Sequence, residues 1–252
     1  MPRQARERSR SGIYHLILRG TNKQTVFEND EDRQKFIETL GYYKMVSNYM
    51  LYGYCLMDNH IHLLIRENEE SISQVIKRIS SSYVYWYNQK YERCGHLFQE
   101  RFKSEVIETD AYFLMALRYI HQNPMKAGIV KDIRKYLWSS YHEYTGTPSI
   151  INIDFALDMF SEDRKKAAAL FKDHTKEKNS DACLDYEERL HVSDNEVVEY
   201  LKGLGIVAIS ELQRLTREQR DDVIRKMKEH KGVTLRQLAR LTGISKSVID
   251  RT

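Results

Sequence analysis

Apolar runs of strand length alternate with longer helical segments over the first 125 residues. Four segments rich in branched and aromatic side chains are predicted as strands: residues 13–19, 50–57, 61–66 and 102–108. Three segments with acidic or hydroxyl residues at their starts are predicted as helices: residues 30–47, 71–91 and 110–122. Pro124 is expected to end the third helix. The order predicts an α+β domain, a ferredoxin- or RRM-like antiparallel sheet with helices packed on one face, over residues 1–145.

The pattern becomes acidic and less regular after this domain. Residues 146–195 are predicted to be an acidic, partly helical connector, with one helix at 154–173. Residues 196–252 are predicted to form an all-α helix-turn-helix module, with a preceding helix at 211–229.

The helix-turn-helix is predicted from a short stretch near the end of the chain. Its first helix begins at Thr234, Gly243 forms the turn and the second helix begins near Ser245. The stretch resembles DnaA-like and sigma-factor-like modules. The second helix has barely two turns before Thr252, as expected for either a truncated chain or a frayed helix end.

The distribution of charge indicates more than its total. The chain has 252 residues and a net charge of +4, divided as +4 over residues 1–150, −5 over 151–205 and +5 over 206–252. Two basic regions around an acidic one favour two modules that face nucleic acid, although ordinary charge fluctuation gives the same pattern. The three cysteines show neither a disulfide framework nor CxxC spacing. Without an apolar segment of membrane-spanning length or a signal core, we expect a soluble cytoplasmic protein that does not bind membranes.

Two clusters of residues carry candidate chemistry. His60 and His62 are two residues apart in a predicted strand, so both imidazoles leave the same face and can hold a metal ion. Tyr119 and Asn123 have i, i+4 spacing and share one face of a predicted helix. A tyrosine hydroxyl beside a divalent cation is a phosphoryl-transfer nucleophile. The alternatives are histidines in polar core contacts and a tyrosine in the core.

These clusters lie in segments that together resemble a known family. The segments are Ser11–Gly20, His60–His62, Gly95–Ser104, Tyr119–Gly128 and Trp138–Tyr141. They resemble the HUH-type single-tyrosine transposases, and among them the REP-associated tyrosine transposases. The similarity spans roughly residues 1–144, so residues 1–145 are expected to form the transposase or nuclease domain.

The resemblance implies a reaction and roles for individual residues. Tyr119 would attack a phosphate of hairpin-forming single-stranded DNA as the catalytic nucleophile, leaving a 5′-phosphotyrosine and a free 3′-hydroxyl. His60, His62 and Asn123 would bind the metal, expected to be Mg²⁺ or Mn²⁺. Imidazole itself suits Mn²⁺ and Zn²⁺ better than Mg²⁺. Family members act as monomers or homodimers, and the residues do not decide between these.

Basic residues supply candidate contacts to DNA. The candidates are Arg3, Arg6, Arg19, Lys23, Arg101, Lys103 and, in the helix-turn-helix, Lys246. The helix-turn-helix would bind double-stranded DNA. The alternative for each charged residue is an ordinary solvated position on the surface.

The leading hypothesis is a metal-dependent single-stranded DNA endonuclease and strand transferase, that is, a DNA transposase. One rival is a catalytically silent DNA- or RNA-binding regulator on the same fold. A third hypothesis, a zinc phosphodiesterase without covalent catalysis, lacks an evident third zinc ligand.

Overall fold

The structure is a computed structural model that describes residues 6–179, 181, 183–185, 192, 194–206, 211–212, 214–230 and 232–252. The chain divides into two compact units, Met1–Asp185 and Tyr186–Thr252. Among the described residues, no helix combines the length and the apolar character needed to cross a lipid bilayer.

The first unit is built on a four-stranded sheet. Its strands are β1 (Ile13–Arg19), β2 (Met50–Met57), β3 (His60–Arg66) and β4 (Lys103–Val106). They lie in the order β2-β3-β1-β4 and every neighbouring pair is antiparallel. The predicted α+β fold is confirmed. The third strand begins at the first histidine of the pair, and the fourth is shorter than predicted.

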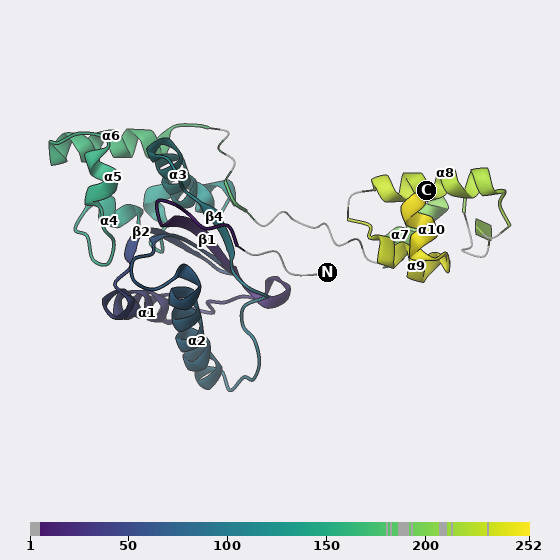
Figure 1. The fold of residues 1–252 in the computed structure, drawn as a ribbon, viewed down its shortest axis with the longest axis horizontal. Coiled ribbons are helices and arrows are strands. Elements are labelled where there is room, and N and C mark those ends of the chain that lie inside the picture. Colours follow the sequence, from purple (N-terminus) through teal and green to yellow (C-terminus); the bar gives the residue numbers. More distant parts are fainter. Residues whose placement is uncertain are drawn as a thin grey trace. The chain divides into compact units, whose positions relative to one another are not determined.

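Helices cover both faces of this sheet, not one face as predicted. The long helices are α1 (Asp30–Ser47), α2 (Ile72–Lys90) and α3 (Asp110–Lys126). Figure 1 shows α1 and α2 on one side of the sheet and α3 on the other. The reason is visible in β1, where the six residues 13–18 are all buried. A strand that is apolar on both sides needs packing on both sides.

A glycine in β2 and a proline in α3 explain how close this helix lies to the sheet and where it ends. A Cβ atom at Gly53 would lie 2.8 Å from Leu117 Cδ1, so the missing side chain lets α3 approach β2 closely. Pro124 does not end α3, which continues to Lys126. This proline lies in the last turn, where its missing N–H costs a single helical hydrogen bond. The chain therefore keeps Asn123 within the helix.

Residues 146–179 are part of the first unit and not a connector. Three short helices follow the sheet: α4 (Tyr141–Thr145), α5 (Asp154–Asp158) and α6 (Arg164–Lys176). The predicted helix at 154–173 is therefore two helices. Their apolar side chains join the main core, where the Phe171 ring stacks on Tyr144 at 4.4 Å. The acidic residues within these helices, Asp154, Asp158 and Asp173, are exposed on the outer surface.

The second unit is helical in its described residues. Its helices are α7 (Asp194–Gly203), α8 (Arg217–Glu229), α9 (Leu235–Thr242) and α10 (Lys246–Arg251). Thr234 caps α9, and Gly243 ends it with a left-handed φ of 70°. Buried side chains of α7 to α10 form a separate small core. Helices α9 and α10 and the turn at Gly243 thus lie at the positions predicted from the sequence, whereas the helix predicted at 211–229 is α8, which begins at Arg217.

Candidate active site

The two histidines leave the same face of the sheet, as the sequence pattern predicts. In the β1–β3 register, Arg19 lies opposite His60 and Ile17 opposite His62. The two imidazole rings have centroids 5.0 Å apart. His62 is fully buried, and His60 is partly exposed at the start of β3. The pair therefore opens toward the start of β3.

Helix α3 brings the predicted tyrosine and asparagine to this pair. The Tyr119 ring centroid lies 6.0 Å from that of His62. Asn123 lies one turn further along α3, and its side chain raises the pKa of His60 and lowers that of Tyr119. Four residues chosen from separate sequence patterns thus meet in one place.

The donor set suits a divalent cation. His62 Nε2 is buried and has no hydrogen-bond partner, so a lone pair is available inside the site. Burial lowers the pKa of His62 well below its ordinary value and also lowers that of His60, which keeps both imidazoles neutral and able to bind a cation. No three His, Cys, Asp or Glu side chains group as a metal site within the described part of the chain. The third ligand would accordingly be the Asn123 amide oxygen.

Two residues that the sequence did not point to, His15 and Glu105, form a row of contacts with His62. His15 Nε2 lies 3.0 Å from His62 Nδ1, and His15 is fully buried. Glu105 lies opposite His15 in the β1–β4 register, with its Oε2 3.6 Å from His15 Nδ1. That distance is longer than a hydrogen bond, so this contact is electrostatic. The alternation of side chains along a strand puts His15 and Glu105 on the same face of the sheet as His60 and His62. This prediction needs the order of the strands, which the sequence does not give.

One arrangement of protons satisfies this row of groups. A free lone pair at His62 Nε2 requires the proton on Nδ1, which then donates to His15 Nε2. His15 must in turn carry its proton on Nδ1, facing the Glu105 carboxylate. The row Glu105–His15–His62 therefore orients the ring of a metal ligand, as carboxylate–histidine pairs do in metal sites.

The Tyr119 hydroxyl has an unpredicted partner. It donates a hydrogen bond to Asp185 Oδ2 at 2.7 Å. Burial, followed by the bond to Asp185 and its charge, raises the pKa of Tyr119 well above the ordinary value for a phenol. The Lys126 Nζ lies 4.3 Å from the centroid of the same ring. In this arrangement the phenol is neutral, and its hydroxyl is fixed by the hydrogen bond to Asp185.

The predicted DNA contacts are spread over both units. Arg3 lies outside the described residues. In the first unit, Lys23 and Arg101 are exposed, whereas Arg6 is half-buried and its guanidinium lies 3.6 Å from the centroid of the Phe102 ring. Arg19 and Lys103 are also half-buried, and Lys103 Nζ donates to the Asp185 carbonyl at 3.4 Å. In the second unit, Lys246 is exposed as the first residue of α10.

His121 belongs to the core. The sequence alone did not decide whether this residue is part of the core or faces the substrate. It is 1% exposed, and its Nε2 lies 2.8 Å from Ser140 Oγ. It points away from the face of α3 that carries Tyr119, because it is two residues from Tyr119, about 200° around the helix.

Comparisons with known proteins agree with this geometry. Residues 9–123 match the family model described as IS200-like transposase. The predicted resemblance is confirmed. A Haemophilus influenzae protein described as a REP-associated tyrosine transposase is 25% identical over 152 residues, which cover 54% of this chain and 84% of the relative. The matched region contains β1 to β4 and ends at Asn123, so it includes the His60–His62 pair, Tyr119 and Asn123.

A solved structure shares the fold. The structure of a REP-associated tyrosine transposase bound to a REP hairpin superposes with a TM-score of 0.53 and 15% identity. The match covers 74% of this chain and all of that chain. At this identity the likeness shows a shared fold and not individual residue roles.

Proposed function

We propose that this protein is a divalent-metal-dependent, single-tyrosine DNA endonuclease and strand transferase that acts on hairpin-forming single-stranded DNA. The observation that carries the proposal is the meeting of Tyr119, Asn123 and the His60–His62 pair on one face of the sheet. The IS200-like family match and the hairpin-bound relative of the same fold support DNA as the substrate.

The chemistry assigns one role to each group. Tyr119 Oη forms a bond to the scissile phosphorus while the bond from phosphorus to the 3′-oxygen breaks, and the phenol proton ends on the released 3′-hydroxyl. The strand on the 3′ side of the break stays attached through its 5′-phosphate as a phosphotyrosine ester. A second 3′-hydroxyl can attack this ester, which joins the strands and releases the phenol. His60, His62 and Asn123 would hold Mg²⁺ or Mn²⁺, which when bound stabilises charge on the phosphoryl oxygens. Two imidazole ligands favour Mn²⁺ over Mg²⁺.

The direct test is a search for the covalent product. Labelled single-stranded oligonucleotides with a hairpin, ideally an imperfect palindrome from the DNA that flanks the coding region, are incubated with the protein and Mn²⁺. We expect a protein-linked DNA band that survives denaturation and disappears in EDTA. Retention of the oligonucleotide without any such band would favour the rival function, a silent DNA- or RNA-binding regulator.

Asp185 is expected to restrain Tyr119. Its carboxylate stabilises the neutral phenol and repels an incoming phosphate, so Asp185→Asn should accelerate adduct formation. Hydrogen bonds to charged groups contribute about 1.5–3 kcal/mol, so we expect the rate to increase by at least about tenfold. Single-turnover adduct formation in Mn²⁺ measures the rate, with Asp181→Asn as the control, because Asp181 pairs with Arg118 instead. A slower rate in Asp185→Asn would identify this carboxylate as a base that assists the attack.

Glu105 is expected to strengthen metal binding without touching the metal. Glu105→Gln removes the charge that orients His15 and thereby His62, and such outer partners commonly contribute about 10–100-fold in metal affinity. Titration calorimetry with Mn²⁺, in the absence of DNA, measures the effect. Glu108→Gln is the matched control, because Glu108 is on the same segment and accepts from the backbone of Arg10 and Ser11. Equal affinities for the two variants would contradict the role of Glu105.

The second unit is proposed to bind double-stranded DNA through α10. The supporting observation is the pair α9 and α10 joined at a left-handed Gly243, with Lys246 exposed at the start of the second helix.

A further inference from the structure

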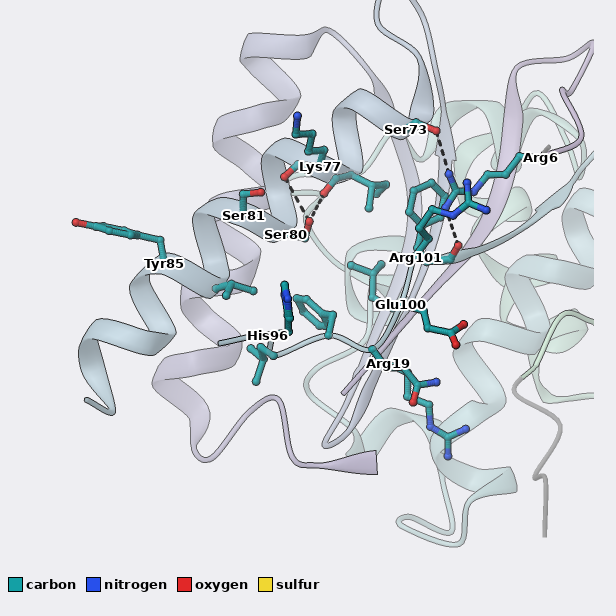
Figure 2. Close-up of a pocket in the computed structure, with 17 residues that line it drawn as sticks. Arg6, Arg19, Ser73, Lys77, Ser80, Ser81, Tyr85, His96, Glu100 and Arg101 are labelled. Carbon is teal, nitrogen blue, oxygen red and sulfur yellow. Dashed lines mark hydrogen bonds between the residues drawn. The ribbon is translucent and has the colours of Figure 1, made fainter. Parts of the chain in front are cut away.

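A cavity of about 620 Å³ lies on the first unit between α2 and the segment 96–102. In Figure 2, Lys77, Ser80 and Ser81 from α2 stand across the cavity from His96 and Arg101. None of its lining residues is among the candidate metal ligands or the nucleophile. The volume is in the range of pockets that bind small molecules.

The lining combines an apolar floor with a basic rim. The floor consists of six side chains that are buried or half-buried: Leu18, Ile76, Val84, Leu97, Phe98 and Phe102. The rim carries four cationic side chains, Arg6, Arg19, Lys77 and Arg101, against the single carboxylate of Glu100. A flat apolar group attached to an anion is complementary to such a site. An unpaired base with its phosphate has this composition, and aromatic side chains accept bases irrespective of sequence.

The cavity adjoins the catalytic face at the end of β1. Leu18 points into the cavity side of the sheet, whereas Arg19, the next residue, alternates toward the histidine face. Arg19 lies opposite His60 in the register, and its charge acts on the His60 imidazole. The backbone of segment 96–102 is tied to the same point, because Gln99 N donates to the Arg19 carbonyl at 2.8 Å. Neighbouring strands are about 4.8 Å apart, so a DNA strand that passes Arg19 reaches the His60 site directly.

We propose that this cavity holds one unpaired base of single-stranded DNA next to the phosphate that Tyr119 attacks. The cavity positions the strand, since a base seated between α2 and Phe98 fixes the backbone beside Arg19. The inference rests on the proposed function for the identity of the strand. The prediction that it makes, a preference for bases over bare backbone, is independent of cleavage.

The test compares two probes that share one charge pattern. Fluorescent (dT)15 and an abasic strand of the same length are titrated into the full chain carrying Tyr119→Phe, in EDTA, with anisotropy as the readout. Base stacking contributes about 1–3 kcal/mol, so we expect (dT)15 to bind roughly tenfold more tightly than the abasic strand. Ser81→Trp, which fills the cavity from an exposed position on α2, should remove that preference.

The controls separate the cavity from the surface around it. Gln89→Trp places the same ring on the exposed face of α2 outside the cavity and should keep the preference. Ser81→Leu fills less space and should reduce the preference in part, which covers the case that Ser81→Trp does not fold. An undiminished preference in folded Ser81 variants, or no preference in the parent, would overturn the proposal.

Failure of this proposal is distinguishable from failure of the proposed function. A chain that prefers bases through the cavity but forms no adduct with Mn²⁺ would keep the cavity assignment and lose the enzyme assignment. An adduct from the unsubstituted chain, together with equal binding of the two probes, would do the reverse.

Discussion

Tyr119→Phe should abolish the covalent DNA adduct, lowering its rate of formation by at least about 1,000-fold, because no other group replaces a lost nucleophile. DNA binding in EDTA should be unchanged, since the ring remains beside His62 and only the hydroxyl is lost. The protein should lose about 1.5 kcal/mol of unfolding free energy with the hydrogen bond to Asp185, the lower end of the range for a charged acceptor, because Asp185 is exposed. Denaturing gels with labelled hairpin oligonucleotides measure the adduct, and thermal unfolding checks the fold.

A matched tyrosine on another helix provides the control. Tyr87 donates to Glu28 Oε1 at 3.0 Å, and burial raises its pKa to about 12. Tyr87→Phe therefore loses the same kind of bond but should retain the adduct. A normal adduct from Tyr119→Phe would reject Tyr119 as the nucleophile. Turnover of DNA without any covalent product, and unaffected by Tyr119→Phe, would instead indicate the non-covalent zinc phosphodiesterase.

His62→Ala should remove metal binding and, with it, the adduct. It deletes the buried ring nitrogen that has no hydrogen-bond partner and also leaves His15 without its neighbour. Because loss of an outer partner alone costs about 10–100-fold, loss of this ligand should weaken Mn²⁺ binding by more than about 100-fold. Electron paramagnetic resonance of free Mn²⁺, in the absence of DNA, measures affinity separately from catalysis.

The control for this variant is a histidine of the same unit whose Nε2 contacts a backbone carbonyl. His142 Nε2 lies 3.2 Å from the Tyr136 carbonyl, so His142→Ala should leave Mn²⁺ affinity unchanged. Equal Mn²⁺ affinity in His62→Ala and the unsubstituted protein would contradict the metal site. Restored affinity in His62→Gln, which offers an amide oxygen, would indicate that the position tolerates ligand exchange.

Local patterns in the sequence predict most of the first unit. The strands β1 and β2 and the helix α1 have the predicted bounds, because strand composition and the capping at Asn29 are local signals. The predicted connector is wrong up to residue 179, because the prediction relied on acidic residues, whereas apolar side chains of the same segment, such as Phe171, pack in the main core. Average composition does not show which face of a helix is buried.

The sequence by itself determined the elements of the site. Spacing of two in a strand puts His60 and His62 on one face, and spacing of four in a helix aligns Tyr119 with Asn123, since both follow from backbone geometry alone. Only the tertiary structure decided what surrounds them. His15, Glu105 and Asp185 are 45 or more residues from the groups they contact, and their roles follow from strand order and the path of the chain after α6. Long-range contacts of this kind leave no periodic signal in one sequence.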